Sequence, residues 1–237
     1  MDILTVAGAP SSGKTAVVTH IIRHLSDKGV TAAAAKFDAL STLDDVRYEK
    51  ELGIAAVKGL SDYTCPDHYY VANLEEVVGW GKGLGVDRLF IETAGLCYRC
   101  APHIHGMPAL TVIDNLGGLD TPEKMGPMLE TADIVAVTKS DMVSQAEKEV
   151  FVHRIQKVAP KAKILTVNGL TGTGIPRLAR EIYALSASAP LTESRLRYPM
   201  PAAICSYCTG EQRIGKAYQS GNIHKIDLSN GGLPHVH

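Results

Sequence analysis

The sequence has almost no excess charge and no long apolar run. Its 24 lysines and arginines and 25 aspartates and glutamates give a net charge of −1. That balance gives no electrostatic reason to expect nucleic acid or an anionic membrane as a partner. No apolar stretch approaches the ~18–20 residues of a membrane span. The start, MDILTVAGAP, lacks the basic segment of a signal peptide, so we expect a cytoplasmic protein.

Cysteine is also scarce. The 237 residues contain 5 cysteines, and two pairs have C-x-x-C spacing, Cys97/Cys100 and Cys205/Cys208. Because disulfides are rare in the cytoplasm, we expect these thiols to serve metal or redox chemistry.

Short apolar runs alternate with helical patterns along most of the chain. The clearest helix carries Val18, Ile21, Ile22 and Leu25 on one face and ends near Gly29. Strands are expected at residues 3–7, 30–37, 86–94, 108–114, 132–138 and 162–167, and further helices at 42–60, 73–85, 121–131, 144–158 and 175–187. This alternation predicts a three-layer α/β fold with a mostly parallel sheet.

The pattern weakens in a stretch rich in Ser, Ala and Pro, where we place a linker at about residues 186–200. We therefore divide the chain into a domain at 1–188 and a short cysteine-containing extension at 189–237. The extension is too small for a core of its own, so metal or docking on the main domain should hold it.

The segment GAPSSGKT matches the phosphate-loop pattern G-x-x-x-x-G-K-[ST]. Its glycines let backbone N–H groups turn toward phosphate oxygens, Lys14 reaches the β- and γ-phosphates, and the Thr15 hydroxyl binds Mg²⁺. An apolar strand before the motif and an amphipathic helix after it support a nucleoside triphosphatase. The nucleotide contacts expected from this loop come from Gly8, Ser11, Ser12, Gly13, Lys14 and Thr15.

Further polar residues follow the predicted strands in order. Asp38 is placed to hold Mg²⁺ through water, and Glu92 with Gly95 forms an acid-x-x-Gly pattern typical of a γ-phosphate sensor. Asp141, after Lys139, can accept two hydrogen bonds from a guanine edge, which adenine cannot donate. Ligands bind at the carboxyl ends of strands in open α/β sheets, so we expect Lys14, Asp38 and Glu92 to be catalytic.

These motifs together resemble the nickel-insertion GTPases of the HypB and UreG type, within the SIMIBI class of P-loop proteins. The resemblance covers residues 1 to about 188. It includes GAPSSGKT, a D-x-x-R pattern at Asp44 or Asp45 and Arg47, FIETAG, VTKSD, and VNGLTGTGI with Asn168 and Gly169 near the base. CPDH, from Cys65 to His68, is similar to the family's Cys–His motif, and Cys100 falls near its later cysteine.

The resemblance implies a homodimer that binds GTP and Mg²⁺, hydrolyses GTP slowly, and delivers a metal to the apo-form of a client metalloenzyme. Nickel is the metal implied by the family, with Zn²⁺ or an iron–sulfur cluster as alternatives. Three features depart from the pattern: Thr138 replaces an Asn that bridges base and loop, one more residue separates Cys65 from His68, and Cys97 adds a second thiol.

One C-x-x-C pair supplies only half of a tetrahedral metal site. The other half is expected from Cys205/Cys208, Cys65/His68, His103/His105, or the same pair on a second subunit. The metal ligands that we expect are Thr15 for Mg²⁺, and Cys65, His68, Cys97, Cys100, Cys205 and Cys208 for the transition metal. A structural zinc knuckle is the alternative for the last pair.

A pair of metal ligands just after the sensor glycine would move with the nucleotide state, so metal affinity and GTP binding would be coupled. The sequence leaves two other functions open. One is an ATP-driven iron–sulfur carrier or electron donor with a cluster between subunits, although Ala9 stands where such proteins have lysine. The other is a small-molecule kinase with structural zinc, against which TKSD and ETAG argue.

Overall fold

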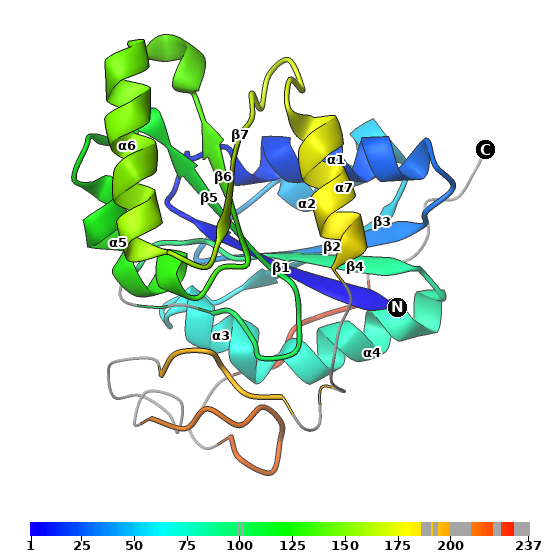
Figure 1. The fold of residues 1–237 in the computed structure, drawn as a ribbon. Helices are drawn as coiled ribbons and strands as arrows, with labels where there is room; N and C mark the ends of the chain where they lie inside the picture. The colour runs from blue at the N-terminus through cyan, green and yellow to red at the C-terminus, as the bar shows by residue number, and fades with distance from the viewer. Residues whose placement is uncertain are drawn as a thin grey trace.

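A single parallel sheet organises the chain. The computed structural model describes residues 1–98, 100, 102–185, 191, 194–199, 210–219 and 224–229. Within them, seven strands form one sheet in the order β3-β2-β4-β1-β5-β6-β7, and every pairing is parallel. The strands are β1 Asp2–Gly8, β2 Ala32–Asp38, β3 Ala55–Leu60, β4 Arg88–Glu92, β5 Ala109–Asp114, β6 Ile134–Thr138 and β7 Lys163–Thr166. The α/β fold with a parallel sheet is thus confirmed (Figure 1).

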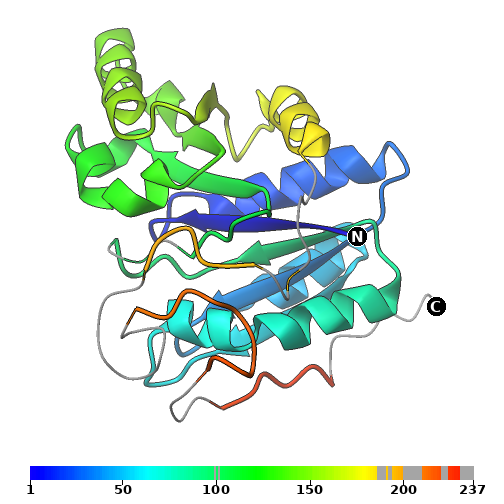
Figure 2. The same ribbon diagram turned by 60° about the horizontal axis from the view of Figure 1, so that its bottom comes forward.

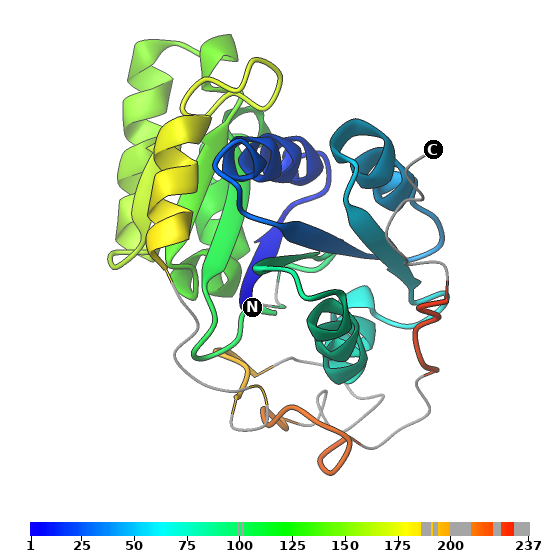
Figure 3. The same ribbon diagram turned by 90° about the vertical axis from the view of Figure 1, so that its right-hand side faces the viewer.

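Helices cover both faces of the sheet. They are α1 Lys14–Ser26, α2 Asp44–Leu52, α3 Pro66–Ala72, α4 Leu74–Leu84, α5 Thr121–Glu130, α6 Gln145–Val158 and α7 Ile175–Ala184, with 3₁₀ turns η1 Asn115–Gly117 and η2 Ser140–Met142. Strand alternation sets the layers: Leu4 packs with α1, α2 and α7, whereas its neighbour Ile3 packs with α3 and α4. Figure 3 shows α1 and α4 on opposite faces. No helix in the described ranges is long and apolar enough to cross a membrane.

The helix predicted over residues 42–60 is wrong in its second half. Helix α2 ends at Leu52, and Gly53 caps it in the left-handed conformation with φ 64°. The chain then forms β3, the edge strand beside β2. Helix α3, which begins with Pro66 at its first turn, was not predicted. These two elements carry the chain from α2 to the thiols described below.

The described parts of the C-terminal region dock on the main domain. Residues 194–199 fall in the predicted linker, yet Leu196 is fully buried and Arg197 binds the carboxylate of Asp133 at 2.8 Å. Farther on, Ile214 and Ile226 enter the core beneath α3 and α4. Figure 2 shows these segments along the same helices. Cys205 and Cys208 lie outside the described residues.

Candidate functional site

The carboxyl ends of the adjacent strands β2, β4 and β1, and of β6 beyond β5, lie at one edge of the sheet. Gly8, Asp38, Glu92 and Thr138 are the last residues of β1, β2, β4 and β6. A pocket of about 360 Å³ lies there, between the loop before α1 and the start of α2. Lys14, Thr15, Asp38 and Glu92, which were predicted separately along the sequence, therefore line one space.

Lys14 occupies this pocket with its ammonium group bound to backbone. The side chain is buried, and Nζ donates to the carbonyls of Gly8, Ala9 and Ala94 at 3.0, 2.9 and 3.2 Å. Burial, which disfavours the charged form, lowers the pKa of Lys14 to about 8. Phosphate oxygens would give this ammonium a stronger partner than the three neutral carbonyls.

Gly95 brings the predicted sensor segment against the phosphate loop. Its φ is +73°, and a Cβ there would meet the carbonyl oxygen of Gly8 at 1.7 Å. Only glycine fits such an approach. If a nucleotide displaces the phosphate loop, the segment after β4 would therefore have to move with it.

Thr15 and two carboxylates form the part of the pocket suited to Mg²⁺. Its Oγ1 lies 3.1 Å from Asp44 Oδ2 and 2.9 Å from Glu92 Oε1. Tyr48 fixes the other oxygen of Glu92 by a hydrogen bond of 2.7 Å. A hydroxyl beside carboxylate oxygens is the donor set that Mg²⁺ prefers, so the residues present fit this ion. Asp44, which the sequence offered together with Asp45, is the one in contact.

Asp38 faces the same pocket from the end of β2. One of its oxygens accepts the backbone N–H of Ala39 at 2.8 Å, and the other lies 4.0 Å from Lys36 Nζ. Asp38 is therefore oriented toward the pocket without contacting Thr15 in any described bond, which fits its predicted role through water.

The predicted base-binding side also meets the phosphate loop. The hydroxyl of Thr138 donates to the carbonyl of Ser12 at 2.7 Å, and Lys139 Nζ donates to that of Ser11 at 2.8 Å. Thr138 thus retains a link to the loop although it lacks the amide of the family's Asn. Asp141 is exposed in η2, where a base could reach its carboxylate.

The last predicted base loop is shaped by its own asparagine. Asn168 Oδ1 accepts the N–H groups of Leu170 and Thr171 at 2.8 and 2.9 Å. A Cβ on Gly169 would lie 3.4 Å from Ala16. The loop therefore folds back onto the start of α1, beside the phosphate loop.

A cluster of thiols and a carboxylate lies just beyond the sensor segment. The Sγ atoms of Cys65 and Cys100 and an oxygen of Asp67 all fall within 4.8 Å of one another. Cys65 is the N-cap of α3, so Asp67 and His68 stand in its first turn. Asp67, His68 and Cys100 are buried. The sequence did not single out Asp67, although the C-x-D-H spacing could have indicated it.

The carboxylate of this cluster is buried, and so is the imidazole of the neighbouring His68, which the structure does not bring within the group of three ligands. Both oxygens of Asp67 and both ring nitrogens of His68 lack a hydrogen bond among the described residues. Burying such groups unpaired is costly. The donor set that the structure brings together, the two thiols of Cys65 and Cys100 and the carboxylate of Asp67, fits a metal ion such as Zn²⁺ or Ni²⁺.

The cluster favours negative charge on one of its three groups, the thiol of Cys65. A hydrogen bond from Cys100 lowers the pKa of Cys65 to about 4, and the same contact raises the pKa of Cys100. Burial, and next the Cys65 thiolate, raise the pKa of Asp67 to about 7. A thiolate is therefore available at neutral pH, as metal binding requires.

The remaining metal candidates take other positions. Cys97 is half-buried, and its carbonyl accepts the N–H of Cys100 at 3.2 Å, but it is not in the cluster as far as the described residues show. His103 lies in the core with Nδ1 2.8 Å from Thr5 Oγ1 and Nε2 3.0 Å from Thr111 Oγ1. With both nitrogens engaged, His103 does not serve as a metal ligand.

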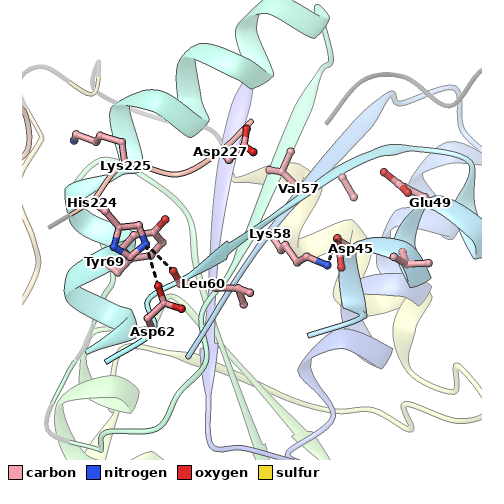
Figure 4. A pocket seen from close by; sticks show the side chains of 12 residues that line it. Asp45, Glu49, Val57, Lys58, Leu60, Asp62, Tyr69, His224, Lys225 and Asp227 are labelled. Atoms are coloured by element: carbon pink, nitrogen blue, oxygen red, sulfur yellow. Dashed lines mark hydrogen bonds and ion pairs between the residues drawn. The ribbon is translucent and has the colours of Figure 1, made fainter. Parts of the chain in front are cut away.

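A larger pocket of about 550 Å³ lies at the β3 edge, apart from this chemistry (Figure 4). Lys58 and Asp45 form an ion pair of 3.1 Å across one side, and His224 contacts the carbonyl of Leu60 at 3.0 Å on the other. Its lining includes no thiol and no phosphate-loop residue. We do not assign the nucleotide or the metal to it.

Comparisons with known proteins agree with this geometry. Residues 2–166 match the family model described as CobW/HypB/UreG, nucleotide-binding domain. The chain is 47% identical over 227 residues to the uncharacterised protein MJ0120 of Methanocaldococcus jannaschii, covering 96% of this chain and 97% of that one. It is 27% identical over 175 residues to the probable hydrogenase maturation factor HypB of the same organism, covering 72% and 77%. The fold matches that of HypB from Helicobacter pylori in complex with nickel, with a TM-score of 0.57 and 18% identity over 77% of this chain and 86% of that one.

Proposed function

Because the chain belongs to the CobW/HypB/UreG family of P-loop GTPases, we propose that it binds and slowly hydrolyses GTP in order to load and release a transition metal at the thiol cluster. One observation carries the proposal. Glu92 of the nucleotide pocket ends β4, and Gly95 against the phosphate loop and Cys100 of the thiol cluster follow it in the chain.

The chain's own groups have distinct roles in the nucleotide step. Lys14 would exchange its three carbonyl partners for the β- and γ-phosphates, which places charge where it develops during phosphoryl transfer. Thr15, Glu92 and Asp44 would hold Mg²⁺, with Asp38 acting through water; the ion, when bound, neutralises phosphate charge. Glu92 and Asp38 would also orient the attacking water. Thr138, Lys139 and Asp141 would hold the base.

The metal step follows from the position of Cys100. A γ-phosphate that engages the N–H of Gly95 would pull the segment after β4 toward the phosphate loop. Cys65 and Asp67 are fixed on α3, which does not carry that segment. The distance between Cys100 and the other two ligands would then depend on the nucleotide, and the metal would be held in one state and released in the other.

Nickel is the metal we propose, by analogy with the nickel-bound HypB structure, and zinc is the closest substitute for the same ligands. We further propose that the client is the apo-form of a metalloenzyme. A two-fold homodimer would let two clusters share a metal, or let Cys97 of each chain complete one, because closed two-fold pairing is the commonest form of self-association.

Elemental analysis of anaerobically purified protein tests the proposal. We expect bound nickel or zinc to change in amount per chain when a non-hydrolysable GTP analogue is added, and no change in a Lys14→Ala variant. Solution mass in the same samples reports dimerisation. Metal content that is identical with GDP, with the analogue and without nucleotide would overturn the coupling, and a brown protein with bound iron would favour the iron–sulfur alternative.

A further inference from the structure

A second lysine, Lys36, stands in the nucleotide pocket. It lies on β2 in register with Glu92 on β4, and its side chain is buried. Its Nζ lies 2.5 Å from Glu92 Oε1 and 3.1 Å from Asp44 Oδ2. It is distinct from the phosphate-loop lysine, and the GTPase roles assigned above do not use it.

Lys36 and Thr15 share the same two oxygen atoms. The hydroxyl of Thr15 is in contact with Glu92 Oε1 and Asp44 Oδ2, and the ammonium of Lys36 contacts both as well. Asp38 adds a third carboxylate at 4.0 Å. The ammonium therefore sits beside the hydroxyl and among the carboxylates that a divalent cation would require.

The ammonium is held there as a charged group. Its ion pairs with the carboxylates of Glu92 and Asp44 hold the ammonium in place. A positive charge at this place repels a second cation, and it neutralises carboxylates that would otherwise attract one.

We propose that Lys36 is a tethered cation that occupies the magnesium position while no nucleotide is bound, so that Mg²⁺ enters only together with a nucleotide. The phosphate chain supplies what displacement requires, because it gives the ammonium new oxygen partners as Mg²⁺ takes over Glu92 and Asp44. Rearrangement around the metal would then begin from nucleotide binding and not from cellular Mg²⁺ alone. This inference rests on the proposed GTPase function.

The direct test measures Mn²⁺, a spectroscopic substitute for Mg²⁺, on nucleotide-free full-length protein. All chains carry Cys65→Ser and Cys100→Ser so that the thiol cluster does not contribute. We expect electron paramagnetic resonance titration to show at least about tenfold tighter Mn²⁺ binding in Lys36→Met than in the parent chain, and no gain in Lys36→Arg, which keeps the charge.

Lys58→Met is the matched control. Lys58 is the register partner of Lys36 on β3, and it pairs with Asp45, the neighbour of Asp44. Figure 4 shows this pair in the pocket at the β3 edge, and neither residue lines the nucleotide pocket. Its loss removes one positive charge nearby and should leave Mn²⁺ affinity unchanged. An equal gain in Lys58→Met, or tight Mn²⁺ binding by the nucleotide-free parent, would overturn the proposal.

Thermal unfolding gives a second readout if Lys36→Met is unstable because Glu92 has lost its partner. We expect the melting temperature of this variant to rise with Mn²⁺ and that of the parent to stay constant; the reverse result would count against the proposal. Nucleotide binding by the parent is measured separately with a fluorescent GDP. Failure there would remove the proposed GTPase function, while the Mn²⁺ comparison still shows whether Lys36 excludes the cation.

Discussion

The nucleotide pocket and the thiol cluster differ in how their polar groups are satisfied. In the pocket, Lys14 binds three carbonyls and Lys36 binds Glu92 and Asp44. In the cluster, Asp67 and His68 are buried and have no hydrogen-bond partner within the described ranges. A ligand must replace existing contacts to enter the first site, whereas at the second site a ligand can add contacts to polar groups that have none among the described residues. We infer that nucleotide exchanges one bonded state for another, and that metal adds stability outright.

The largest expected effect comes from removing the side chain of Lys14 from the nucleotide pocket, where the polar groups already have partners. In Lys14→Ala, we expect GTP hydrolysis to fall by about 10²–10³-fold, because the ammonium that would move to the phosphates is gone. A phosphate-release assay measures the rate, and circular dichroism confirms the fold. Lys58→Ala is the control and should keep most activity, because Lys58 does not line the nucleotide pocket. Full activity in a folded Lys14→Ala protein would contradict the phosphate role.

The thiol cluster is tested by comparing the two thiols of one C-x-x-C pair, Cys97 and Cys100. We expect Cys100→Ser to weaken Ni²⁺ or Zn²⁺ binding by about a hundredfold, at least the cost of losing an outer-shell partner. Cys97→Ser should change it little if the chain binds metal through Cys65, Asp67 and Cys100. Equal losses in competition titrations would instead make Cys97 a ligand, as the sequence predicts, and would place the site between subunits.

Metal binding at the thiol cluster should also raise the free energy of unfolding. With metal at about 100 times its dissociation constant, we expect about 2.7 kcal/mol of added stability in the wild type. Denaturant unfolding measures it, and Cys65→Ser/Cys100→Ser is the variant that should lose it. Unchanged unfolding on metal addition would show that the buried groups of the cluster find other partners.

A smaller effect is expected at the base. We expect GDP to bind at least about tenfold tighter than ADP, or about 1.4 kcal/mol, and Asp141→Asn to remove that preference. Thr138→Val should weaken both nucleotides alike by a few-fold, because it breaks the bond to the carbonyl of Ser12 without touching the base edge. Competition binding measures all six affinities, GDP and ADP for each of the three proteins. Equal affinity of the wild type for GDP and ADP would sink the guanine assignment.

Much of the fold was predictable because local signals carry it. The phosphate loop, the apolar strands and the long helices are set by spacing within a few residues. Strand β3 was missed because its residues, AAVKGL, continue a helix pattern as well as they form a strand, although Gly53 marks the helix end. A glycine after the last periodic residue was the signal that could have found it.

The candidate site was predictable where residues lie close in sequence and not where they lie far apart. The pairing of Cys65 with Cys100 depends on the unpredicted α3, which brings its N-cap beside the segment after β4. The contact of Lys36 with Glu92 depends on strand register, which the order β2-β4 creates. Residues 194–199 were predicted to be part of a linker because their contacts are also distant in sequence. Arg197 reaches Asp133 only in the folded chain.

Two buried histidines give the most selective test of the comparison. His68 has no partner in the described structure, whereas His103 is bonded to Thr5 and Thr111. Burial, and then the charge of Arg197, lower the pKa of His103 from 6.5 to about 3. Between these values the unfolded chain binds the proton and the folded chain does not. Stability from His103 is therefore complete above pH 6.5 and is lost as pH falls toward 3, at about 1.4 kcal/mol per pH unit. We expect denaturant unfolding of metal-free protein to show this slope in the wild type and a shallower one in His103→Gln, with His105→Gln unchanged; equal slopes in all three proteins would mean that His103 is protonated in the fold and that its two threonine contacts do not hold it neutral.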